Sequence, residues 1–328
     1  MNIAIIGGGW VGCHLAVKLK NTHKITIYEK NKTLFEETSY NNQNRLHLGF
    51  HYSRNSKTRN LCLNTFDRFL KDYSFLTKEL SKNLYCIPEN ESIIDYDTFK
   101  EIFKKYDTEE VSTDLKTIEG CVKTNERFIN FKHANSFFND ELKDLVVNET
   151  IDTVKLKKLQ TKYDLIINCT NNHIKDKNKL NSFYESTITL IYEKINETEF
   201  DALTLVDGKL FSIYPYQNNE YTVTDVEHTP IKKFKSVKKL NQFINQFNPD
   251  IIKKKQTLIE SRIKKYYGNF TNDFKYKSYL LSTKSKIENL SDDRSPIISD
   301  EGNLINCFTG KIQGIYLIED YLKEKYNL

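Results

Sequence analysis

The sequence predicts an α/β fold in which a Rossmann-like nucleotide domain is interrupted by an inserted antiparallel sheet. Three observations predict it. An apolar strand at residues 2–6 leads into a glycine loop and then a helix, as in a βαβ unit. From about residue 179 to 285, polar and apolar residues alternate at period two, which is typical of antiparallel strands. Residues 295–326 return to an α/β pattern, so the first domain is discontinuous.

The remaining elements follow from the apolar periodicity and the turn residues. Outside the insertion we expect strands at 24–28, 146–148, 151–156, 163–170, 295–298 and 304–308, and helices at 58–73, 134–145 and 312–326. Inside it we expect strands at 187–192, 210–214 and 220–226 and a Lys-rich helical stretch at 236–265. The predicted nucleotide domain therefore comprises residues 1–84, 124–178 and 292–328, and the substrate domain comprises 85–123 and 179–291.

The glycine loop has the form G-x-G-x-x-G, with Gly7, Gly9 and Gly12 between strand and helix. In this context the first glycine makes the tight turn, the second lets the backbone approach a pyrophosphate, and the third lets helix and strand pack closely. The helix N-terminus supplies free N–H groups for the anion. The second strand ends at Glu29, where a carboxylate binds a ribose hydroxyl and disfavours NADP. The segment predicts binding of FAD or NAD.

Composition limits the partners and the compartment. The chain has 328 residues, with 49 basic and 44 acidic side chains spread along it, so we expect a small-molecule substrate and neither nucleic acid nor membrane as partner. The sequence enters the first strand directly and has no apolar run of transmembrane length, which predicts a cytoplasmic protein. Its six cysteines form no C-x-x-C pair or Cys/His cluster, so we expect reduced thiols and no metal site.

Four separated segments resemble the FAD-dependent oxidoreductases of the D-amino-acid oxidase, glycine oxidase and sarcosine oxidase (DAO) family. They are the opening glycine fingerprint with Glu29, residues 163–170, residues 293–298 and residues 309–314. The resemblance implies FAD lying extended, with its adenine near Glu29 and its isoalloxazine ring at the border of the antiparallel sheet. It also implies that the C-terminal helix points N–H groups at the flavin N1–C2=O edge, which stabilises the reduced anion.

The resemblance assigns a set of residues to the cofactor. They are Gly7, Gly9, Trp10, Val11, Gly12, Glu29, Lys30, Asn44, Arg45, Leu46, Ile151, Thr170, Arg294, Thr309, Gly310, Lys311 and Ile312. Where the family has Thr-Gly, this chain has Thr170-Asn171, and Asn can adopt the left-handed conformation of the glycine. Cys307 lies near the flavin loop, so a thioether-linked flavin is an alternative to noncovalent FAD.

Residues 42–52 differ from the small-residue loop that the family carries against the flavin. The segment is rich in Asn, Arg and His, and it resembles a bacterial subgroup of the family associated with surface-polysaccharide gene sets. We expect Arg45 to contact cofactor phosphate or flavin. His47 and His51 are four residues apart, and we expect at least one of them to face the substrate, since histidine is readily tuned for proton transfer.

The inserted sheet offers further candidates. Tyr214 and Tyr216 share one face of a strand, which either roofs the substrate or packs against the other domain. Arg54 and Arg262 are the candidates for binding a substrate carboxylate. The predicted catalytic set is therefore His47, His51 and Tyr214.

The leading functional hypothesis is removal of a hydride from a carbon bearing an amine, with transfer to flavin N5 and hydrolysis of the imine by water. An alternative keeps FAD but oxidises an alcohol or sugar carbon in surface-polysaccharide precursor synthesis, with His47 or His51 accepting the hydroxyl proton. A third is a non-catalytic flavin-binding module. An NAD dehydrogenase is disfavoured because it leaves the loop at 309–311 unexplained.

Overall fold

The computed structural model describes residues 1–174, 181–288 and 293–328. A six-stranded sheet has the order β17-β18-β10-β1-β2-β9. Its strands are β1 (Asn2–Ile6), β2 (Lys24–Glu29), β9 (Val146–Asn148), β10 (Leu165–Asn168), β17 (Ile297–Glu301) and β18 (Leu304–Phe308). Neighbouring strands are parallel except β17 against β18. The predicted α/β fold is confirmed, because the last strands of the chain complete the sheet that the first strand begins.

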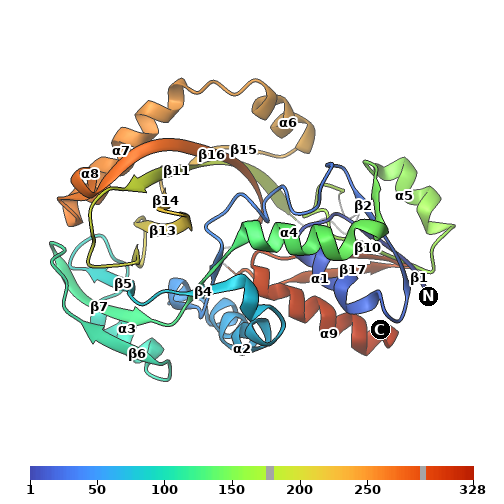
Figure 1. Ribbon diagram of the computed structural model, residues 1–328, viewed down its shortest axis with the longest axis horizontal. Coiled ribbons are helices and arrows are strands. Elements are labelled where there is room, and N and C mark those ends of the chain that lie inside the picture. Colours follow the sequence, from blue (N-terminus) through green and yellow to red (C-terminus); the bar gives the residue numbers. More distant parts are fainter. Residues whose placement is uncertain (175–180, 289–292) are drawn as a thin grey trace.

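Both faces of this sheet are covered by helices. One face carries α1 (Trp10–Leu19), α2 (Ser56–Tyr73), α4 (Phe131–Leu142) and α9 (Ile315–Tyr326), and α5 (Thr153–Gln160) packs on the other. The alternation of β1 explains the layering: Ile3 and Ile5 join the first core, whereas Ala4 and Ile6 join the second. Figure 1 shows this lobe with both chain termini at its outer end.

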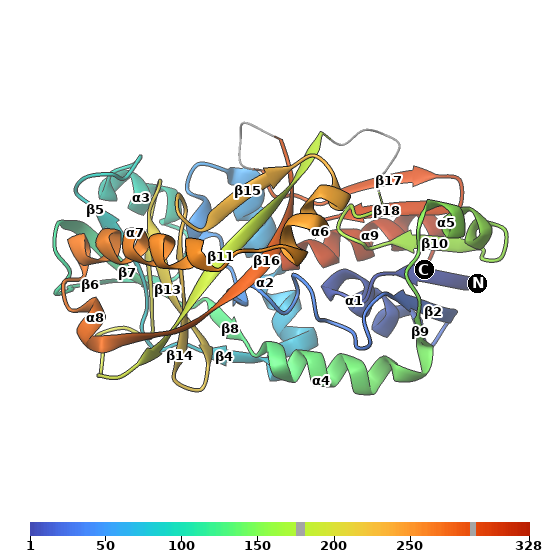
Figure 2. The same cartoon turned by 90° about the horizontal axis from the view of Figure 1, so that it is seen from above.

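The second lobe is built on a nine-stranded sheet with the order β15-β11-β14-β13-β12-β5-β7-β6, and β16 also pairs with β11. The strands are β5 (Asn83–Pro88), β6 (Thr108–Val111), β7 (Ile118–Thr124), β11 (Ser182–Lys194), β12 (Ala202–Leu205), β13 (Phe211–Gln217), β14 (Glu220–Asp225), β15 (Pro230–Phe234) and β16 (Phe274–Ile287). The long strands β11 and β16 arch from this lobe towards the first one (Figures 1 and 2).

Helices cover the outer face of this sheet. They are α6 (Val237–Asn245), α7 (Asp250–Tyr266) and α8 (Phe270–Asp273). On the other face, α3 (Tyr96–Phe103) packs against β5 and β7. Ile188 and Leu190 of β11 and Ile259 and Ile263 of α7 belong to one apolar core. The opposite face of the sheet is turned towards the first lobe. No helix within the described ranges is long and apolar enough to cross a membrane.

A third, three-stranded sheet holds the segment that follows the glycine unit. It has the order β3-β8-β4, with β3 (Arg45–Leu46), β4 (Thr77–Glu79) and β8 (Arg127–Ile129), and the short 3₁₀ turn η1 (Phe50–Tyr52) comes after β3. Side chains alternate along a strand, so Leu46 enters the core of the first lobe while Arg45 points to the second. This alternation places the Arg45 guanidinium between the lobes.

Several predicted elements are corrected by the structure. The expected strand at 151–156 is helical, because Asp152 caps α5 by accepting hydrogen bonds from the N–H groups of Val154 and Lys155 at 2.9 and 2.8 Å. The Lys-rich stretch at 236–265 forms two helices separated by a break that ends at Pro249. The proposed domain limits at 178/179 and 291/292 involve residues 175–180 and 289–292, which lie outside the described residues.

The expectation of six reduced thiols is wrong for two cysteines. Cys86 of β5 lies opposite Cys121 of β7 in the antiparallel register, and their sulfur atoms form a disulfide. The two residues are 35 positions apart in sequence, so only the strand pairing brings them together. Cys13, Cys62, Cys169 and Cys307 are free thiols.

Thiol counting tests this assignment. Alkylation of the denatured, unreduced protein is expected to modify four cysteines, and alkylation after reduction is expected to modify six. Intact mass spectrometry measures both numbers, and peptide mapping should find Cys86 joined to Cys121. Six modified cysteines without reduction would show that the pair is reduced.

Candidate active site

A cavity of about 1070 Å³ lies between the two large sheets. Its walls are the glycine loop, the segment from Thr38 to Asn55, the loop at 309–312 and the inner face of β11, β13, β14 and β16. Ligand sites span roughly 300–1,000 Å³, so this volume suits a large ligand. The carboxyl ends of β1 and β10 open into it, the usual location of a nucleotide in a parallel α/β sheet.

The glycine loop fits a dinucleotide. Gly7 has φ +102°, and a Cβ there would lie 2.9 Å from the carbonyl oxygen of Cys169. A Cβ on Gly12 would lie 2.0 Å from the carbonyl oxygen of Gly7, so this glycine packs helix against strand and does not line the cavity. The carboxylate of Glu29 accepts hydrogen bonds from the N–H groups of Gly8 at 2.7 Å and Asn31 at 2.9 Å. These hydrogen bonds hold the Glu29 carboxylate at the edge of the glycine loop.

Replacing Gly12 with Ala is expected to abolish cofactor retention. The added methyl group overlaps the Gly7 carbonyl, so α1 has to move away from the loop. Absorbance of the purified variant measures bound flavin. Gly302 serves as the control, since a Cβ there meets nothing within 4 Å, and Gly302→Asn suits its φ of +67°. Full flavin content in Gly12→Ala would contradict the packing role.

Most of the predicted site residues line this one cavity. They are Gly7, Gly9, Trp10, Val11, Glu29, Lys30, Asn44, Arg45, His47, His51, Ile151, Thr170, Arg294, Thr309, Gly310, Lys311 and Ile312. Gly12, Leu46 and Tyr214 are outside its lining, because Gly12 faces Gly7, Leu46 enters the apolar core and Tyr214 lies beneath Arg45. The expectation for Asn171 is confirmed, since its φ is +52°.

The loop before α9 reaches back to the histidine segment. The side-chain amide of Gln313 donates to the carbonyl oxygens of His47 at 2.5 Å and Cys62 at 2.9 Å. Lys311 Nζ lies 4.6 Å from the centre of the Tyr52 ring. Burial, together with nearby positive charges, lowers the pKa of Lys311 to about 8. These contacts join the loop before α9 to the histidine segment.

Arg45 lies at the centre of a buried polar network. Its Nη1 donates to the hydroxyl of Tyr85 at 2.9 Å and to Thr204 Oγ1 at 2.8 Å, and its guanidinium lies 4.0 Å from the centre of the Tyr214 ring. The Tyr85 hydroxyl donates in turn to Glu126 Oε2 at 2.7 Å. All these contacts are with the protein, and the expected contact of Arg45 with cofactor phosphate or flavin stays a prediction.

Glu126 is a functional candidate that the sequence did not reveal. It is fully buried, and its Oε1 accepts hydrogen bonds from the N–H groups of Leu48 at 2.8 Å and Gly49 at 3.4 Å. Burial alone raises its pKa, but His47, Arg45 and Tyr85 outweigh that effect and lower the pKa to about 2. Glu126 is therefore the counter-charge of Arg45, supplied 81 residues further along the chain.

His47 and His51 are neutral at pH 7. Burial, followed by the charge of Lys311, lowers the pKa of His47 to about 4, although Glu126 opposes the shift. Burial and the charge of Arg45 lower the pKa of His51 well below its ordinary value. The Nδ1 of His47 lies 3.5 Å from Glu126 Oε1, which leaves Nε2 on the far edge of the ring. A neutral imidazole oriented in this way can accept a proton.

Stability is expected to fall on mild acidification because of these histidines. An unfolded His has a pKa of about 6.5, whereas that of His47 is about 4 in the folded protein. Between these values only the unfolded state binds the proton, so the free energy of unfolding falls by about 2 kcal/mol from pH 6.5 to 5. Urea denaturation at both pH values measures this loss, which His47→Asn should reduce. An unchanged pH slope in that variant would contradict the burial of a neutral His47.

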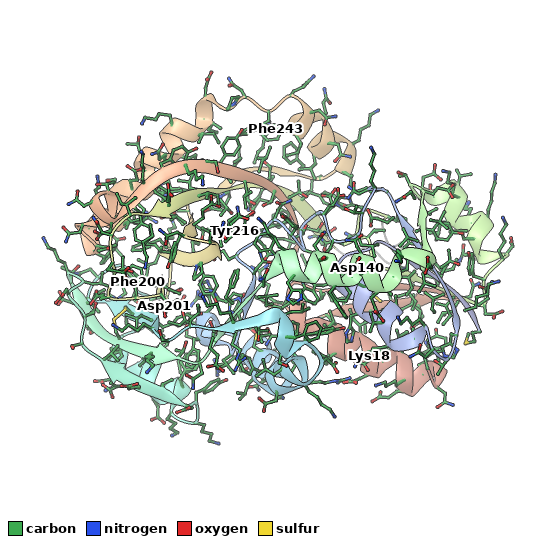
Figure 3. All side chains as sticks on the ribbon, in the orientation of Figure 1. Lys18, Asp140, Phe200, Asp201, Tyr216 and Phe243 are labelled. Atoms are coloured by element: carbon green, nitrogen blue, oxygen red, sulfur yellow. A yellow bond between two sulfur atoms is a disulfide. The ribbon has the colours of Figure 1, made fainter. Side chains whose placement is uncertain are left out.

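The candidate carboxylate-binding arginines are both paired within the chain. Arg54 forms an ion pair with Asp207, with 3.2 Å between Nη2 and Oδ1. Arg262 pairs with Glu227 at 2.7 Å and Asp225 at 3.3 Å, and it lies outside the cavity lining. Tyr214 and Tyr216 pack within the protein. Tyr216 stacks on Phe131, with 4.7 Å between the ring centres, beside the start of α4 (Figure 3).

Lys284 is another lining residue that the sequence did not single out. It comes from β16, and burial together with the charge of Lys286 lowers its pKa to about 8. Cys169 and Cys307 also line the cavity. Along β11, Thr187 and Thr189 line the cavity while Ile188 and Leu190 are in the core. This alternation in the sequence could have indicated that one face of the strand forms a polar cavity wall.

A parallel sheet with a glycine cradle, sharing one cavity with an antiparallel sheet, defines a dinucleotide-dependent enzyme. Residues 2–88 match the FAD dependent oxidoreductase family, DAO. The chain is 32% identical over 334 residues to the FAD-dependent monooxygenase FPY4 of Fusarium mangiferae, covering 97% of this chain and 89% of that protein. The chain belongs to the DAO family, it is an FAD-dependent oxidoreductase, and its cofactor is FAD.

Further similarities agree with this placement. The FAD-dependent monooxygenase kojA of Aspergillus flavus is 23% identical over 359 residues, covering 96% of this chain and 83% of that one. Among solved structures, glycine oxidase from Geobacillus kaustophilus has a TM-score of 0.70 at 12% identity and covers 99% and 95% of the two chains. The L-amino acid deaminase of Proteus myxofaciens has a TM-score of 0.69 at 10% identity, covering 99% and 90%. FPY4 and kojA come from fungi, so they give no support to the expected bacterial subgroup.

Proposed function

We propose that this protein oxidises a carbon that bears a hydroxyl group, with His47 accepting the hydroxyl proton. The observation that carries the proposal is a neutral imidazole in the cavity wall, 3.5 Å from a buried carboxylate. FAD, when bound, accepts the hydride that leaves the same carbon. Loss of the proton to His47 leaves the oxygen free to form the carbonyl as the hydride departs.

Each nearby residue has a part in this proposal. Glu126 Oε1 lies 3.5 Å from Nδ1 of His47, where its negative charge would stabilise the imidazolium after proton transfer. Lys311 places positive charge at the loop that the family resemblance puts beside the flavin N1–C2=O edge. We also propose that Glu29 and the glycine loop hold the adenosine half of FAD, as the cradle geometry favours.

Oxidation of an amine is the competing hypothesis. It needs no strong base, but an amino-acid substrate needs a partner for its carboxylate. Arg54 and Arg262 are each committed to carboxylates of the chain. This pairing argues against the two arginines that the sequence offered for a substrate carboxylate. A second candidate function is oxygen insertion, because the relatives FPY4 and kojA are FAD-dependent monooxygenases by name.

Flavin bleaching separates these functions. The purified protein should show flavin absorption bands, and acid precipitation should release the flavin if it is noncovalent. Under anaerobic conditions we expect alcohols to bleach the flavin and amino acids to leave it oxidised. Bleaching by amino acids alone would replace the alcohol with an amine. Bleaching only by NADH or NADPH, with oxygen consumed when substrate is added, would favour the monooxygenase.

Two finer expectations remain proposals. We place the nucleotide domain at residues 1–84, 124–178 and 292–328 and the substrate domain at 85–123 and 179–291, in keeping with the strands that form the two large sheets. We also retain a cytoplasmic location, which fractionation of the source cells tests directly.

A further inference from the structure

The cavity face of the nine-stranded sheet carries a row of hydroxyl groups. Thr224, Ser212, Thr204 and Tyr85 are consecutive cross-strand neighbours on β14, β13, β12 and β5. Ser212 Oγ and Thr224 Oγ1 are 3.0 Å apart, and both residues line the cavity. Buried sheet faces ordinarily carry apolar side chains, as the opposite face of this sheet does. A sheet face lined with hydroxyl groups therefore indicates a polar ligand.

The strand β11 extends this polar surface. Glu185, Thr187 and Thr189 lie at alternate positions and all line the cavity. All three side chains are buried. Hydroxyl groups both donate and accept hydrogen bonds, so such a wall matches a ligand whose own groups do the same. Several of these hydroxyls already bond within the chain, Thr187 Oγ1 to Ser282 Oγ at 2.9 Å among them, and a hydroxyl can make a further hydrogen bond to a ligand.

Two side chains reach onto the row, Gln43 from the segment before β3 and Arg45 from β3 itself. Gln43 Oε1 accepts from Ser212 Oγ at 3.1 Å, and Gln43 Nε2 donates to Thr222 Oγ1 at 3.2 Å. Arg45 donates to Thr204 and Tyr85 only through Nη1. Its Nη2 is buried and has no hydrogen-bond partner in the part of the chain that the structure describes, although Arg45 is only 5% exposed. An unused charged donor at this depth is costly unless a ligand accepts from it.

We propose that the substrate is a polyhydroxylated molecule, a sugar or cyclic polyol, bound against Ser212, Thr224 and Gln43 with one oxygen accepting from Arg45 Nη2. This inference rests on the proposed alcohol oxidation and names its substrate class. The hydroxyl that loses its proton lies at His47, while the other hydroxyls bind the row. Each such hydrogen bond adds to the affinity, so several together discriminate strongly against a simple alcohol.

The test measures binding separately from turnover. The FAD-loaded protein is titrated anaerobically with hexoses, pentoses and inositol, and with cyclohexanol and 2-propanol as alcohols that lack the further hydroxyls. Binding is followed by the shift in melting temperature and by perturbation of the flavin spectrum. We expect at least one polyol to bind at least 100-fold more tightly than either simple alcohol.

Paired variants localise the effect. Ser212→Ala combined with Thr224→Val is expected to weaken polyol binding at least tenfold, with little change for cyclohexanol. Ser186→Ala is the matched control, because Ser186 is also buried in the same sheet but lies outside the cavity lining. Equal binding of polyols and simple alcohols, or unchanged polyol affinity in the double variant, would overturn the substrate class even if alcohols bleach the flavin. Tight polyol binding without bleaching would instead reject the oxidation and retain the class.

Discussion

Replacing His47 with Asn is expected to lower kcat/KM for the hydroxylated substrate by about 10²- to 10⁴-fold, the usual contribution of a positioned general base. The loss should fall mainly on kcat, because His47 accepts a proton only as the C–H bond breaks. The wild type should keep its activity down to about pH 5, since the base has a pKa of about 4. Anaerobic stopped-flow reduction of the flavin measures the step directly.

Two further variants make this result specific. His133 is exposed on α4, so His133→Asn should leave reduction unchanged. His51 also lines the cavity, and a larger loss in His51→Asn than in His47→Asn would move the base to His51. Flavin absorbance must be equal in all three proteins. Unchanged flavin reduction in His47→Asn would reject His47 as the base.

Replacing Glu126 with Gln is expected to lower the free energy of unfolding by about 3–5 kcal/mol, the cost of leaving a buried charge without its counter-charge. Glu126 is the ionised group that balances Arg45 through the Tyr85 hydroxyl. Gln keeps the size of the side chain but removes the charge. Urea denaturation followed by tryptophan fluorescence measures the change, because the single Trp10 is in the core of the first lobe.

The control for this variant is Glu101→Gln, an exposed glutamate of α3, whose ion pair with Lys104 should contribute at most about 1 kcal/mol. A combined Glu126→Gln, Arg45→Met variant should recover part of the lost stability, since both charges are then removed. Equal stability of Glu126→Gln and wild type would show that Arg45 does not depend on this carboxylate.

The cofactor half of the site was predictable because its parts are close in sequence. Gly7, Gly9 and Gly12 lie within one turn, and Glu29 ends the next strand, so local geometry fixes their relation. The C-terminal loop was found through the family resemblance, and Lys311 lines the cavity as expected. The histidine segment was also visible as an unusual cluster of polar side chains.

Other features depended on pairing between distant strands. Residues 151–156 contain Ile151, Val154 and Leu156, which favour a strand, but the Asp152 cap starts helix α5 there. The disulfide joins residues that only the register of β5 and β7 places opposite each other. Tyr214 carries the right chemistry for a site, but its position beneath Arg45 keeps it from the cavity.

The sequence by itself determined the fold class, the dinucleotide cradle and the segment that holds the histidines, because each is encoded within one short stretch of chain. Only the tertiary structure decided the partners of those residues. Glu126 approaches His47 from the turn before β8, and Ser212 and Thr222 bond to Gln43 across the lobes. The protonation state of His47 and the polarity of the cavity wall depend on burial and on charges from remote segments, which no local pattern records.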